Sequence, residues 1–390
     1  WAVARGIEVW TDIDLAWRLR DKVGKPADWI CVTGTNGKTT TVQLATHIMK
    51  TAGLRVESCG NIGTPILDCI RDEIGFDALV VELSSFQLHY LQEIKPFASA
   101  VLNVDQDHID WHGSFGAYLT AKGKVFANVE AACVFNQADE KTMHLVEDAD
   151  VQEGARAIGF TTGFPGPSQI GYTDGLLIDN AYSGNRALKE LECLAEYSDI
   201  EQIGVVTKHL LQNTAAAAAL VRAYGVPARA VAAGIASFKL DAHRIELILE
   251  RDGVSWIDDS KATNPHAASA SLESFDSIVW IVGGLLKGVD IAPLVEKHAS
   301  RLKAAIVIGL DREPVLRALG IHANNVPVIE IGSGDAVMER AVMAAAGVAS
   351  AGDTVLLAPS SASMDQFKDY ADRGHQFAAA VKRIGGDNNG

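Results

Sequence analysis

The chain has 390 residues, which is too long for one ordinary domain and predicts two. Hydrophobic residues make up 48% of the sequence, enough for well-filled cores, and the formal net charge at pH 7 is -15. Because a general nucleic-acid binder needs a basic face, this acidity argues against one. No apolar run approaches the roughly 20 residues of a membrane helix, so we expect no membrane span.

The cysteines and the start of the chain bear on where the protein works. The five cysteines are scattered and none forms a Cys-x-x-Cys pair, which argues against a disulfide framework and against a zinc site. No secretory signal is visible, so we expect a reduced, cytoplasmic protein. The chain begins at Trp1 without an initiator Met, and we expect its opening stretch to be the remnant of a longer amino-terminal segment.

The first part of the chain alternates short apolar runs with helical segments. Residues 29–33 read as a buried strand, residues 34–37 as a turn, and residues 38–51 as a helix that Gly53 closes. Strands alternating with helices predict a mostly parallel sheet with helices on both faces. We expect further strands at 78–83 and 98–104, loops and short antiparallel strands within 154–180, and helices at 213–224 and 226–238.

A second series of strands and helices follows a boundary near Leu240. This pattern predicts a Rossmann-like, doubly wound domain in which ligands bind at the carboxyl ends of the strands. The predicted fold class is therefore α/β throughout, with two such domains. We expect the first strand of the second domain at 254–258, further strands at 277–282, 304–308, 326–331 and 354–358, and a helix at 336–349.

The segment Gly34-Thr35-Asn36-Gly37-Lys38-Thr39 lies between a predicted strand and a predicted helix. Its glycines let backbone N–H groups approach phosphates, and the helix N-terminus favours negative charge. Lys38 can reach the β- and γ-phosphates, and the Thr39 hydroxyl can bind Mg²⁺. The longer phosphate-loop pattern requires Gly where this chain has Val32, so the alternative is a tight turn before a helix that starts with Lys.

Acidic, histidine and lysine side chains follow the next strands. Glu82 ends a predicted strand, where a carboxylate is well placed to bind a metal or is simply exposed to solvent. The segment from Asn103 to His112 holds three acids and two histidines, which suits metal or phosphate binding as well as a polar capping loop. Lys122 and Lys124 lie on a helical stretch and read as surface lysines.

Six short segments occur in order along almost the whole chain: Gly34–Thr39, Asn61–Gly63, Glu82–Leu88, Asp107–Asp110, Asp259–Asn264 and Ser363–Lys368. Their combination resembles the Mur ligase family, whose members form amide bonds with ATP in bacterial cell-wall synthesis, and within it the branch that adds D-glutamate. The short phosphate loop of that family also accounts for Val32.

The resemblance implies three domains. Residues 1–23 would be the remnant of an amino-terminal uridine-binding domain with its linker, residues 24–240 a central ATP-binding domain with a phosphate loop, and residues 241–390 an amino-acid-binding domain. It also implies ATP and two Mg²⁺ sites. The implied substrates are UDP-N-acetylmuramoyl-L-alanine and D-glutamate, and we expect a monomer that joins these two substrates through an acyl phosphate.

The resemblance further assigns roles to single residues. It implies Lys38, Glu82, His108 and Lys122 as catalytic residues, with Thr39, Glu82, His108 and a carbamylated Lys122 as metal ligands. The implied nucleotide contacts are Gly34, Thr35, Asn36, Gly37, Lys38, Thr39, Thr40, Asn213, Arg244, Asp259 and Lys261. The implied substrate contacts are Thr263, Lys287, Ser363 and Tyr370 for D-glutamate and Asn61 and Ser85 for the muramoyl substrate.

Two other functions fit the same motifs. A folylpolyglutamate synthase or another Mur ligase would add a different amino acid, and the segments 82–87 and 365–368 favour D-glutamate. A nucleotide-binding module without turnover is the alternative outside the enzymes.

Overall fold

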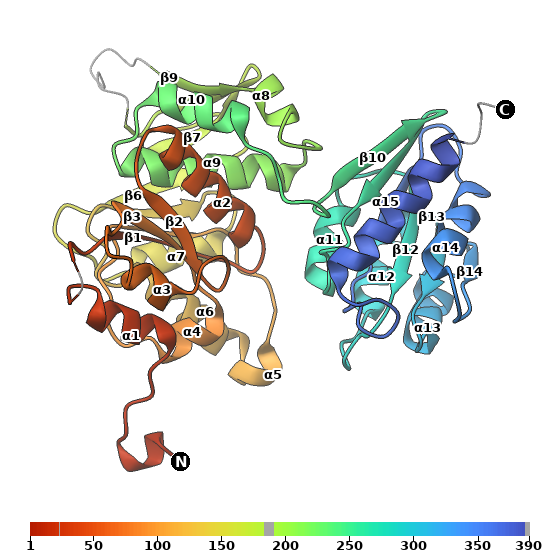
Figure 1. Ribbon diagram of the computed structural model, residues 1–390, viewed down its shortest axis with the longest axis horizontal. Helices are drawn as coiled ribbons and strands as arrows, with labels where there is room; N and C mark the ends of the chain where they lie inside the picture. The colour runs from red at the N-terminus through yellow and green to blue at the C-terminus, as the bar shows by residue number, and fades with distance from the viewer. Residues whose placement is uncertain (23, 183–190, 387–390) are drawn as a thin grey trace. The chain divides into compact units, whose positions relative to one another are not determined.

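The structure is a computed structural model that describes residues 1–22, 24–182 and 191–386. It divides into two compact units, Trp1–Lys239 and Leu240–Gly390. Each unit has one sheet with helices packed on it (Figure 1), so the predicted α/β class is confirmed. In the described ranges, no helix has both the length and the apolar character needed to cross a membrane.

The first unit contains a nine-stranded sheet in the order β2-β3-β1-β4-β5-β6-β7-β8-β9. The strands from β2 to β7 pair in parallel, and β8 and β9 pair antiparallel with their neighbours. The strands are β1 (Asp28–Thr33), β2 (Val56–Gly60), β3 (Ala78–Glu82), β4 (Ala98–Val101), β5 (Ala132–Asn136), β6 (Arg156–Phe160), β7 (Gln169–Thr173), β8 (Leu176–Asp179) and β9 (Glu192–Glu196).

Helices cover both faces of this sheet, as buried parallel strands require. Alternate residues of β1 face opposite sides, and Trp29 and Cys31 pack into a core formed with α1, α3 and α6. The other face carries α2, α9 and α10, and the five alanines at 215–219 of α9 are fully buried. The helices are α1 (Asp12–Leu19), α2 (Lys38–Thr51), α3 (Ile66–Ile70), α4 (Ser85–Tyr90), α5 (Ile109–His112), α6 (Phe115–Gly123), α7 (Glu140–Glu147), α8 (Tyr197–Glu201), α9 (Lys208–Ala223) and α10 (Ala228–Ser237), with 3-10 turns at Val3–Arg5 and Lys124–Phe126.

The second unit contains a six-stranded sheet in the order β10-β11-β15-β12-β13-β14. The strands are β10 (Glu246–Arg251), β11 (Val254–Asp258), β12 (Ile278–Gly283), β13 (Leu302–Ile308), β14 (Val328–Glu330) and β15 (Thr354–Leu357). The helices are α11 (Pro265–Leu272), α12 (Ala292–His298), α13 (Glu313–His322), α14 (Val337–Ala346) and α15 (Tyr370–Gly386), with a 3-10 turn at Ala299–Arg301.

The prediction that residues 254–258 form the first strand of this unit is wrong. An earlier strand, β10, pairs antiparallel with β11 at the edge of the sheet. Its residues are half-buried or exposed, and Glu246 and Glu250 limit its apolar run to Leu247–Leu249. A run of three apolar residues is shorter than the runs of the central strands, so the criterion that identified those strands did not detect it.

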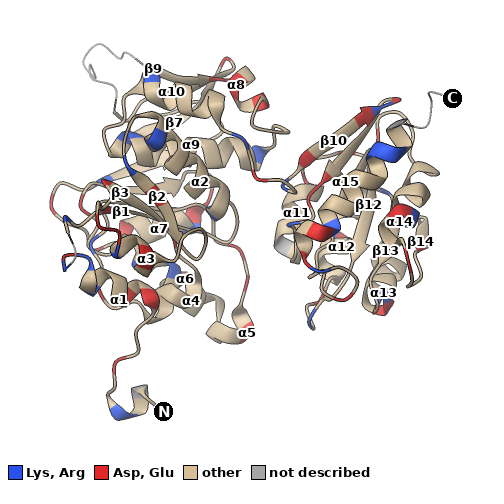
Figure 2. Cartoon of the chain, viewed as in Figure 1, with Lys and Arg blue, Asp and Glu red and all other residues tan. Residues whose placement is uncertain are grey.

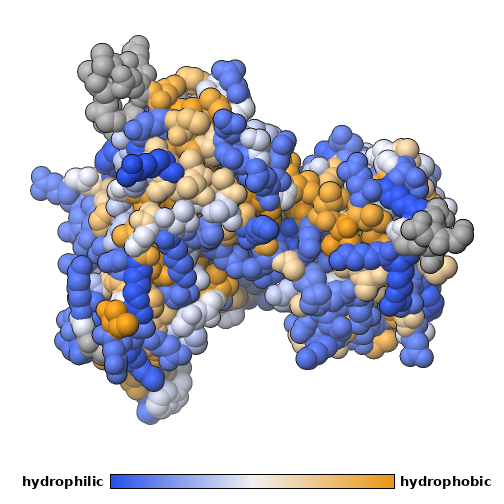
Figure 3. Space-filling model, turned by 45° about the horizontal axis from the view of Figure 1, so that its top comes forward, coloured by the Kyte–Doolittle hydropathy of each residue, from blue (hydrophilic) through white to orange (hydrophobic). Residues whose placement is uncertain are grey.

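The surface is mixed in both charge and polarity. Figure 2 shows acidic and basic residues interspersed on both units. Figure 3 shows hydrophobic residues on the surface of each unit. The exposed large side chains include Trp10 and Trp111 in the first unit and Ile321 and Met343 in the second.

Candidate functional site

The loop between β1 and α2 has a tight, glycine-dependent geometry. Gly37 precedes the first turn of α2 and has a left-handed φ of 83°. A Cβ atom on Gly37 would lie 2.2 Å from Oδ1 of Asn213, which projects from α9. The structure therefore places Asn213 directly against the predicted phosphate loop. Within the first turns of α2, Thr39 is half-buried and Thr40 is buried.

Asn103, which follows the neighbouring strand β4, forms hydrogen bonds with the loop. Asn36 N–H donates to Oδ1 of Asn103 at 2.8 Å, and Asn103 Nδ2 donates to the Asn36 carbonyl at 3.1 Å. Thr35 N–H donates to the Asn103 carbonyl at 3.0 Å. The Thr35 hydroxyl is 2.9 Å from the Tyr118 hydroxyl. Neither Asn103 nor Tyr118 was predicted as a site residue, although Asn103 lies in the polar segment after a predicted strand.

Two lysines converge on the same loop. Lys38 Nζ donates to the carbonyl oxygens of Gly34 and Thr35, both at 2.9 Å. Lys122 Nζ donates to the Gly34 carbonyl at 2.8 Å and approaches Oγ1 of Thr33 at 3.4 Å. Lys122 is only 2% exposed. The interpretation of Lys122 as a surface lysine is therefore wrong.

Burial changes the chemistry of Lys122. Loss of hydration, reinforced by the positive charge of Lys38, lowers the pKa of the Lys122 amine well below its usual value. The negative charges of Asp107 and Glu82 oppose this lowering only in part. The neutral, nucleophilic form of the amine is favoured as a result.

Glu82 lies beside the phosphate loop at the end of β3. It pairs in register with Val32 of β1, two residues before Gly34, and it is 2% exposed. Asn61 Nδ2 donates to Oε1 of Glu82 at 2.9 Å. The other oxygen, Oε2, is buried and accepts no hydrogen bond from the residues that the structure describes. A buried carboxylate oxygen without a donor is suited to bind a cation.

The two histidines after β4 differ in their surroundings. His108 has a left-handed φ of 52° and a side chain that is 46% exposed, and its Nε2 is 3.5 Å from Oδ2 of Asp107. Its ring lies 4.7 Å from the ring of Phe86. His112 Nε2 is 3.1 Å from the Ser85 hydroxyl, and burial lowers the pKa of His112. The structure thus links His112, which was not predicted as a site residue, to the predicted substrate contact Ser85.

In the second unit, three loops meet at the carboxyl ends of the strands. Ser360 N–H donates to the Ala262 carbonyl at 2.9 Å, and Leu285 N–H donates to the Ala362 carbonyl at 2.8 Å. These bonds join the loops after β11, β15 and β12. The loops carry Thr263, Ser363 and Lys287 respectively, so the structure brings these predicted contacts to one edge of the sheet. Tyr370 lies at the same edge, where Nζ of Lys261 is 5.2 Å from its ring centre.

The predicted nucleotide contacts Arg244 and Asp259 lie close to one another. Asp259 is 7% exposed, and burial raises the pKa of its carboxyl to about 6. Hydrogen bonds from the Ser271 hydroxyl and the Ile245 N–H, and the charge of Arg244, oppose that rise. The Arg244 Nε is buried and has no hydrogen-bond partner among the described residues.

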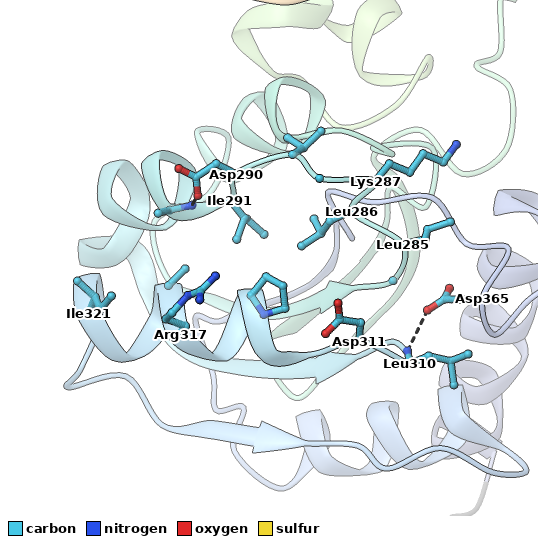
Figure 4. A pocket seen from close by; sticks show the side chains of 16 residues that line it. Leu285, Leu286, Lys287, Asp290, Ile291, Leu310, Asp311, Arg317, Ile321 and Asp365 are labelled. Atoms are coloured by element: carbon cyan, nitrogen blue, oxygen red, sulfur yellow. Dashed lines mark hydrogen bonds between the residues drawn. The ribbon is translucent and has the colours of Figure 1, made fainter. Parts of the chain in front are cut away.

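A cavity of about 590 Å³ lies on the β13 side of the loop that carries Lys287 (Figure 4). Leu286 and Ile291 point into it, whereas Lys287 extends away from it. The cavity is also lined by Asp311, Arg317 and Lys287, but not by Thr263, Ser363 or Tyr370. The cavity therefore shares only Lys287 with the four predicted amino-acid contacts.

Among the described residues, one group of three His, Cys, Asp or Glu side chains has ligand atoms within 4.8 Å of each other: His243, Glu246 and Asp258. Its atoms already bond to one another. His243 Nδ1 is 2.7 Å from Oδ2 of Asp258, and the His243 N–H donates to Glu246 at 2.8 Å. This group is a hydrogen-bond network next to Arg244, and the predicted metal ligands are elsewhere.

Comparison with known proteins identifies the family of the chain. The family model for the Mur ligase middle domain matches residues 32–221, and the model for the Mur ligase glutamate ligase domain matches residues 243–361. The UDP-N-acetylmuramoylalanine–D-glutamate ligase of Leifsonia xyli is 53% identical over 99% of this chain and 77% of its own length. The protein of the same name from Streptomyces coelicolor is 50% identical over 97% of this chain and 80% of its own length.

Solved structures share the fold at low identity. A MurF ligase from Thermotoga maritima in complex with ADP has a TM-score of 0.64 at 20% identity, over 96% of this chain and 86% of that one. An E. coli FolC in complex with ADP has a TM-score of 0.64 at 20% identity, over 96% and 93%. Both domain models match in order and relatives align along almost the entire sequence, so the chain belongs to the Mur ligase family, as its motifs predict.

Proposed function

We propose that the chain joins D-glutamate to UDP-N-acetylmuramoyl-L-alanine, with ATP converted to ADP and phosphate, in the synthesis of peptidoglycan precursors. The names of its relatives support this reaction. The observation that carries the proposal is the buried amine of Lys122 on the Gly34 carbonyl, with Lys38 on the same oxygen and Glu82 beside the loop.

The chemistry is carboxylate activation. A carboxylate oxygen of the alanine attacks the γ-phosphorus of ATP, ADP leaves, and an acyl phosphate forms. The D-glutamate amine then attacks the acyl carbon, phosphate leaves, and the amine loses a proton. Negative charge builds up on the transferred phosphoryl group. Lys38 and the backbone N–H groups of the loop stabilise this charge effectively, because the fold holds them in place before the reaction.

Mg²⁺ fits the residues beside the loop. The Glu82 Oε2 is buried without a donor, and the Thr39 hydroxyl lies in the first turn of α2. These two groups would hold a first ion, and a carbamate on Lys122 together with His108 would hold a second. When bound, Mg²⁺ supplies positive charge that neutralises phosphate oxygens.

The carbamate on Lys122 follows from the state of its amine. A neutral amine adds to the carbon of CO₂ and releases one proton, which leaves an anionic oxygen ligand on the side chain. The lowered pKa of Lys122 raises the fraction of its amine that is neutral. An unmodified cation at this position would instead repel Mg²⁺.

The remaining predicted roles are part of the same proposal. Thr263, Ser363, Lys287 and Tyr370 would bind D-glutamate, because they share one edge of the second sheet. Asn61 and Ser85 would contact the muramoyl substrate beside Glu82. The nucleotide would be bound by the loop Gly34–Thr40 together with Asn213, Arg244, Asp259 and Lys261. We further propose a monomer in the reducing cytoplasm, consistent with five free cysteines, four of them buried.

A panel of amino acids tests the substrate assignment. Purified chain, ATP, Mg²⁺ and UDP-N-acetylmuramoyl-L-alanine are incubated with D-glutamate, L-glutamate, L-lysine or meso-diaminopimelate, and ADP and the product mass are measured. We expect ADP and a glutamyl product with D-glutamate alone. Turnover with another amino acid would assign the chain to a different ligase, and nucleotide binding without ADP formation would make it a binding module.

A further inference from the structure

Arg373 is a buried cation in the first turn of α15. It is 0% exposed, whereas arginine side chains are almost never fully buried unless they are paired with an acid. Its hydrogen bonds go to neutral oxygens. Nε donates to the Ser260 hydroxyl at 2.9 Å, Nη2 to the Ser260 carbonyl at 2.8 Å, and Nη1 to the Ser361 carbonyl at 3.1 Å.

These acceptors connect the loops at the carboxyl edge of the second sheet. Ser260 follows β11, and Ser361 follows β15. The third loop, after β12, begins with Gly284, on which a Cβ would lie 2.7 Å from the Ser361 hydroxyl and 3.5 Å from Nη1 of Arg373. The guanidinium therefore bonds to two of these loops and lies next to the third, and the three loops carry Thr263, Ser363 and Lys287.

The two carboxylates whose charges act on Arg373, Asp258 and Asp365, form no ion pair with it. Asp258 accepts hydrogen bonds from His243 and from the Ser260 N–H, and Asp365 accepts from the Leu310 N–H at 3.0 Å. Both raise the pKa of Arg373, but burial is the larger influence and lowers it to about 10. Arg373 therefore stays positively charged at neutral pH, and within the described residues no carboxylate forms an ion pair with it.

We propose that Arg373 is the positioning residue of the amino-acid site: its guanidinium bonds the loops after β11 and β15 to each other beside the third loop, and its charge favours an amino acid with two carboxylates. The inference rests on the proposed function and extends it to specificity. Arg373 is assigned a positioning role because its side chain is 0% exposed and its guanidinium donates to protein oxygens. The role requires the planar guanidinium of arginine. The single ammonium nitrogen of a lysine cannot reproduce the three bonds that the separate nitrogens of Arg373 make to the Ser260 hydroxyl, the Ser260 carbonyl and the Ser361 carbonyl.

The test compares Arg373→Gln and Arg373→Lys with the wild-type chain. We measure the KM for D-glutamate, the KM for ATP, and the ratio of kcat/KM for D-glutamate to that for D-glutamine. Both variants should raise the KM for D-glutamate by about tenfold or more while the KM for ATP changes by less than about threefold. Arg373→Gln, which removes the charge, should also lower the preference for D-glutamate, and Arg373→Lys should retain more of it.

Arg383→Gln is the matched control, because Arg383 is on the same helix but its side chain is 65% exposed and pairs with Glu339. It should leave both KM values unchanged. Ser260→Ala is a milder second probe that removes one acceptor of the guanidinium, and it should raise the KM for D-glutamate alone. If the Arg373 variants do not fold, the KM values of Ser260→Ala test the proposed role of Arg373.

Two outcomes overturn the inference: unchanged KM values for D-glutamate in the folded variants, or equal rises for D-glutamate and ATP. A wild-type chain that forms no ADP with D-glutamate would instead overturn the proposed function, so the two failures are distinguishable.

Discussion

The side-chain nitrogen of Lys122 lies 2.8 Å from the carbonyl oxygen of Gly34, the first residue of the phosphate loop. This contact joins α6 to the end of β1 across 88 positions of the sequence. It places a buried amine next to Lys38 and within the electrostatic influence of Glu82. Substitutions of these residues should therefore separate the roles of charge, metal binding and backbone geometry.

Lys122→Ala should lower the rate of ADP formation by at least about a hundredfold, because it removes both the amine and any carbamate formed on it. A short carboxylate such as acetate or formate, supplied at high concentration, should restore part of the activity by occupying the vacated position. Steady-state rates with and without the carboxylate measure the effect.

Lys124→Ala is the control for that experiment. Lys124 follows two residues later and is half-buried, and its Nζ donates to the His89 carbonyl rather than to the loop. This variant should keep most of the activity and gain nothing from added carboxylate. If Lys122→Ala keeps the wild-type rate, the proposed carbamate has no role in catalysis.

Glu82→Gln should abolish the binding of metal but preserve the local structure. The amide retains an oxygen that accepts from Asn61, so the hydrogen bond of 2.9 Å can persist while the negative charge is lost. We expect kcat to fall by about a hundredfold or more. In thermal melts, Mg²⁺ should raise the protection given by ADP in the wild type and have no effect in the variant.

Glu57→Gln, on the neighbouring strand β2, serves as its control. The Glu57 side chain is 29% exposed and pairs with Lys50 at 3.3 Å, so its loss should leave Mg²⁺-dependent protection intact. A Glu82→Gln variant that still responds to Mg²⁺ would contradict the assignment of Glu82 as a ligand.

Gly37→Ala and Gly53→Ala separate backbone strain from crowding at the two ends of α2. Both glycines have a left-handed φ, 83° and 87°, but a Cβ on Gly53 would meet no atom within 4 Å, whereas one on Gly37 would lie 2.2 Å from Asn213. Gly53→Ala should lower stability by about 1–2 kcal/mol through strain alone. Gly37→Ala should lower it further and also abolish nucleotide binding.

Urea unfolding and ADP titration, each performed on both variants, check this pair. Equal losses of stability in the two variants would mean that Asn213 moves aside without penalty. In that case the close approach of α9 to the loop would not explain the need for Gly37.

Strands buried on both faces were the most predictable part of the fold. The predicted strand 254–258 has the bounds of β11, and the predicted 354–358 differs from β15 by one residue. Their apolar runs reflect burial from two sides. The edge strand β10 was missed, because its exposed residues break that pattern.

The site was predictable only where its functional residues are adjacent in the sequence. The glycines and Lys38 of the phosphate loop stand together between a strand and a helix. By contrast, the burial of Lys122 and Arg373 depends on which strands and loops become neighbours in space. A lysine within a helix normally indicates a solvated face, so Lys122 was interpreted as a surface lysine, and the sequence did not single out Arg373. Resemblance to a family, and not composition, singled out Lys122.

Asp259 gives the second unit an unusual dependence of stability on pH. Burial raises the pKa of Asp259 to about 6 in the folded chain, from an ordinary value of 3.8. Between these values the folded state binds a proton that the unfolded state has released, so this residue makes stability fall as pH rises from about 4 to 6. A shift of about two units corresponds to a contribution of about 3 kcal/mol.

Asp259→Asn removes this contribution, since an amide does not ionise and can still accept from the Ile245 N–H. The melting temperature of the variant should exceed that of the wild type at pH 7.5, and the gap should close as pH falls towards 4.5. Asp252→Asn is the control, because the Asp252 side chain is 87% exposed. The difference in melting temperature between this variant and the wild type should be the same at every pH. Asp259→Asn should also weaken ATP binding. A buried carboxylate that destabilises the folded chain is expected where its charge contacts a ligand. A gap that stays constant across the pH range would show that Asp259 ionises in the folded chain as readily as in water.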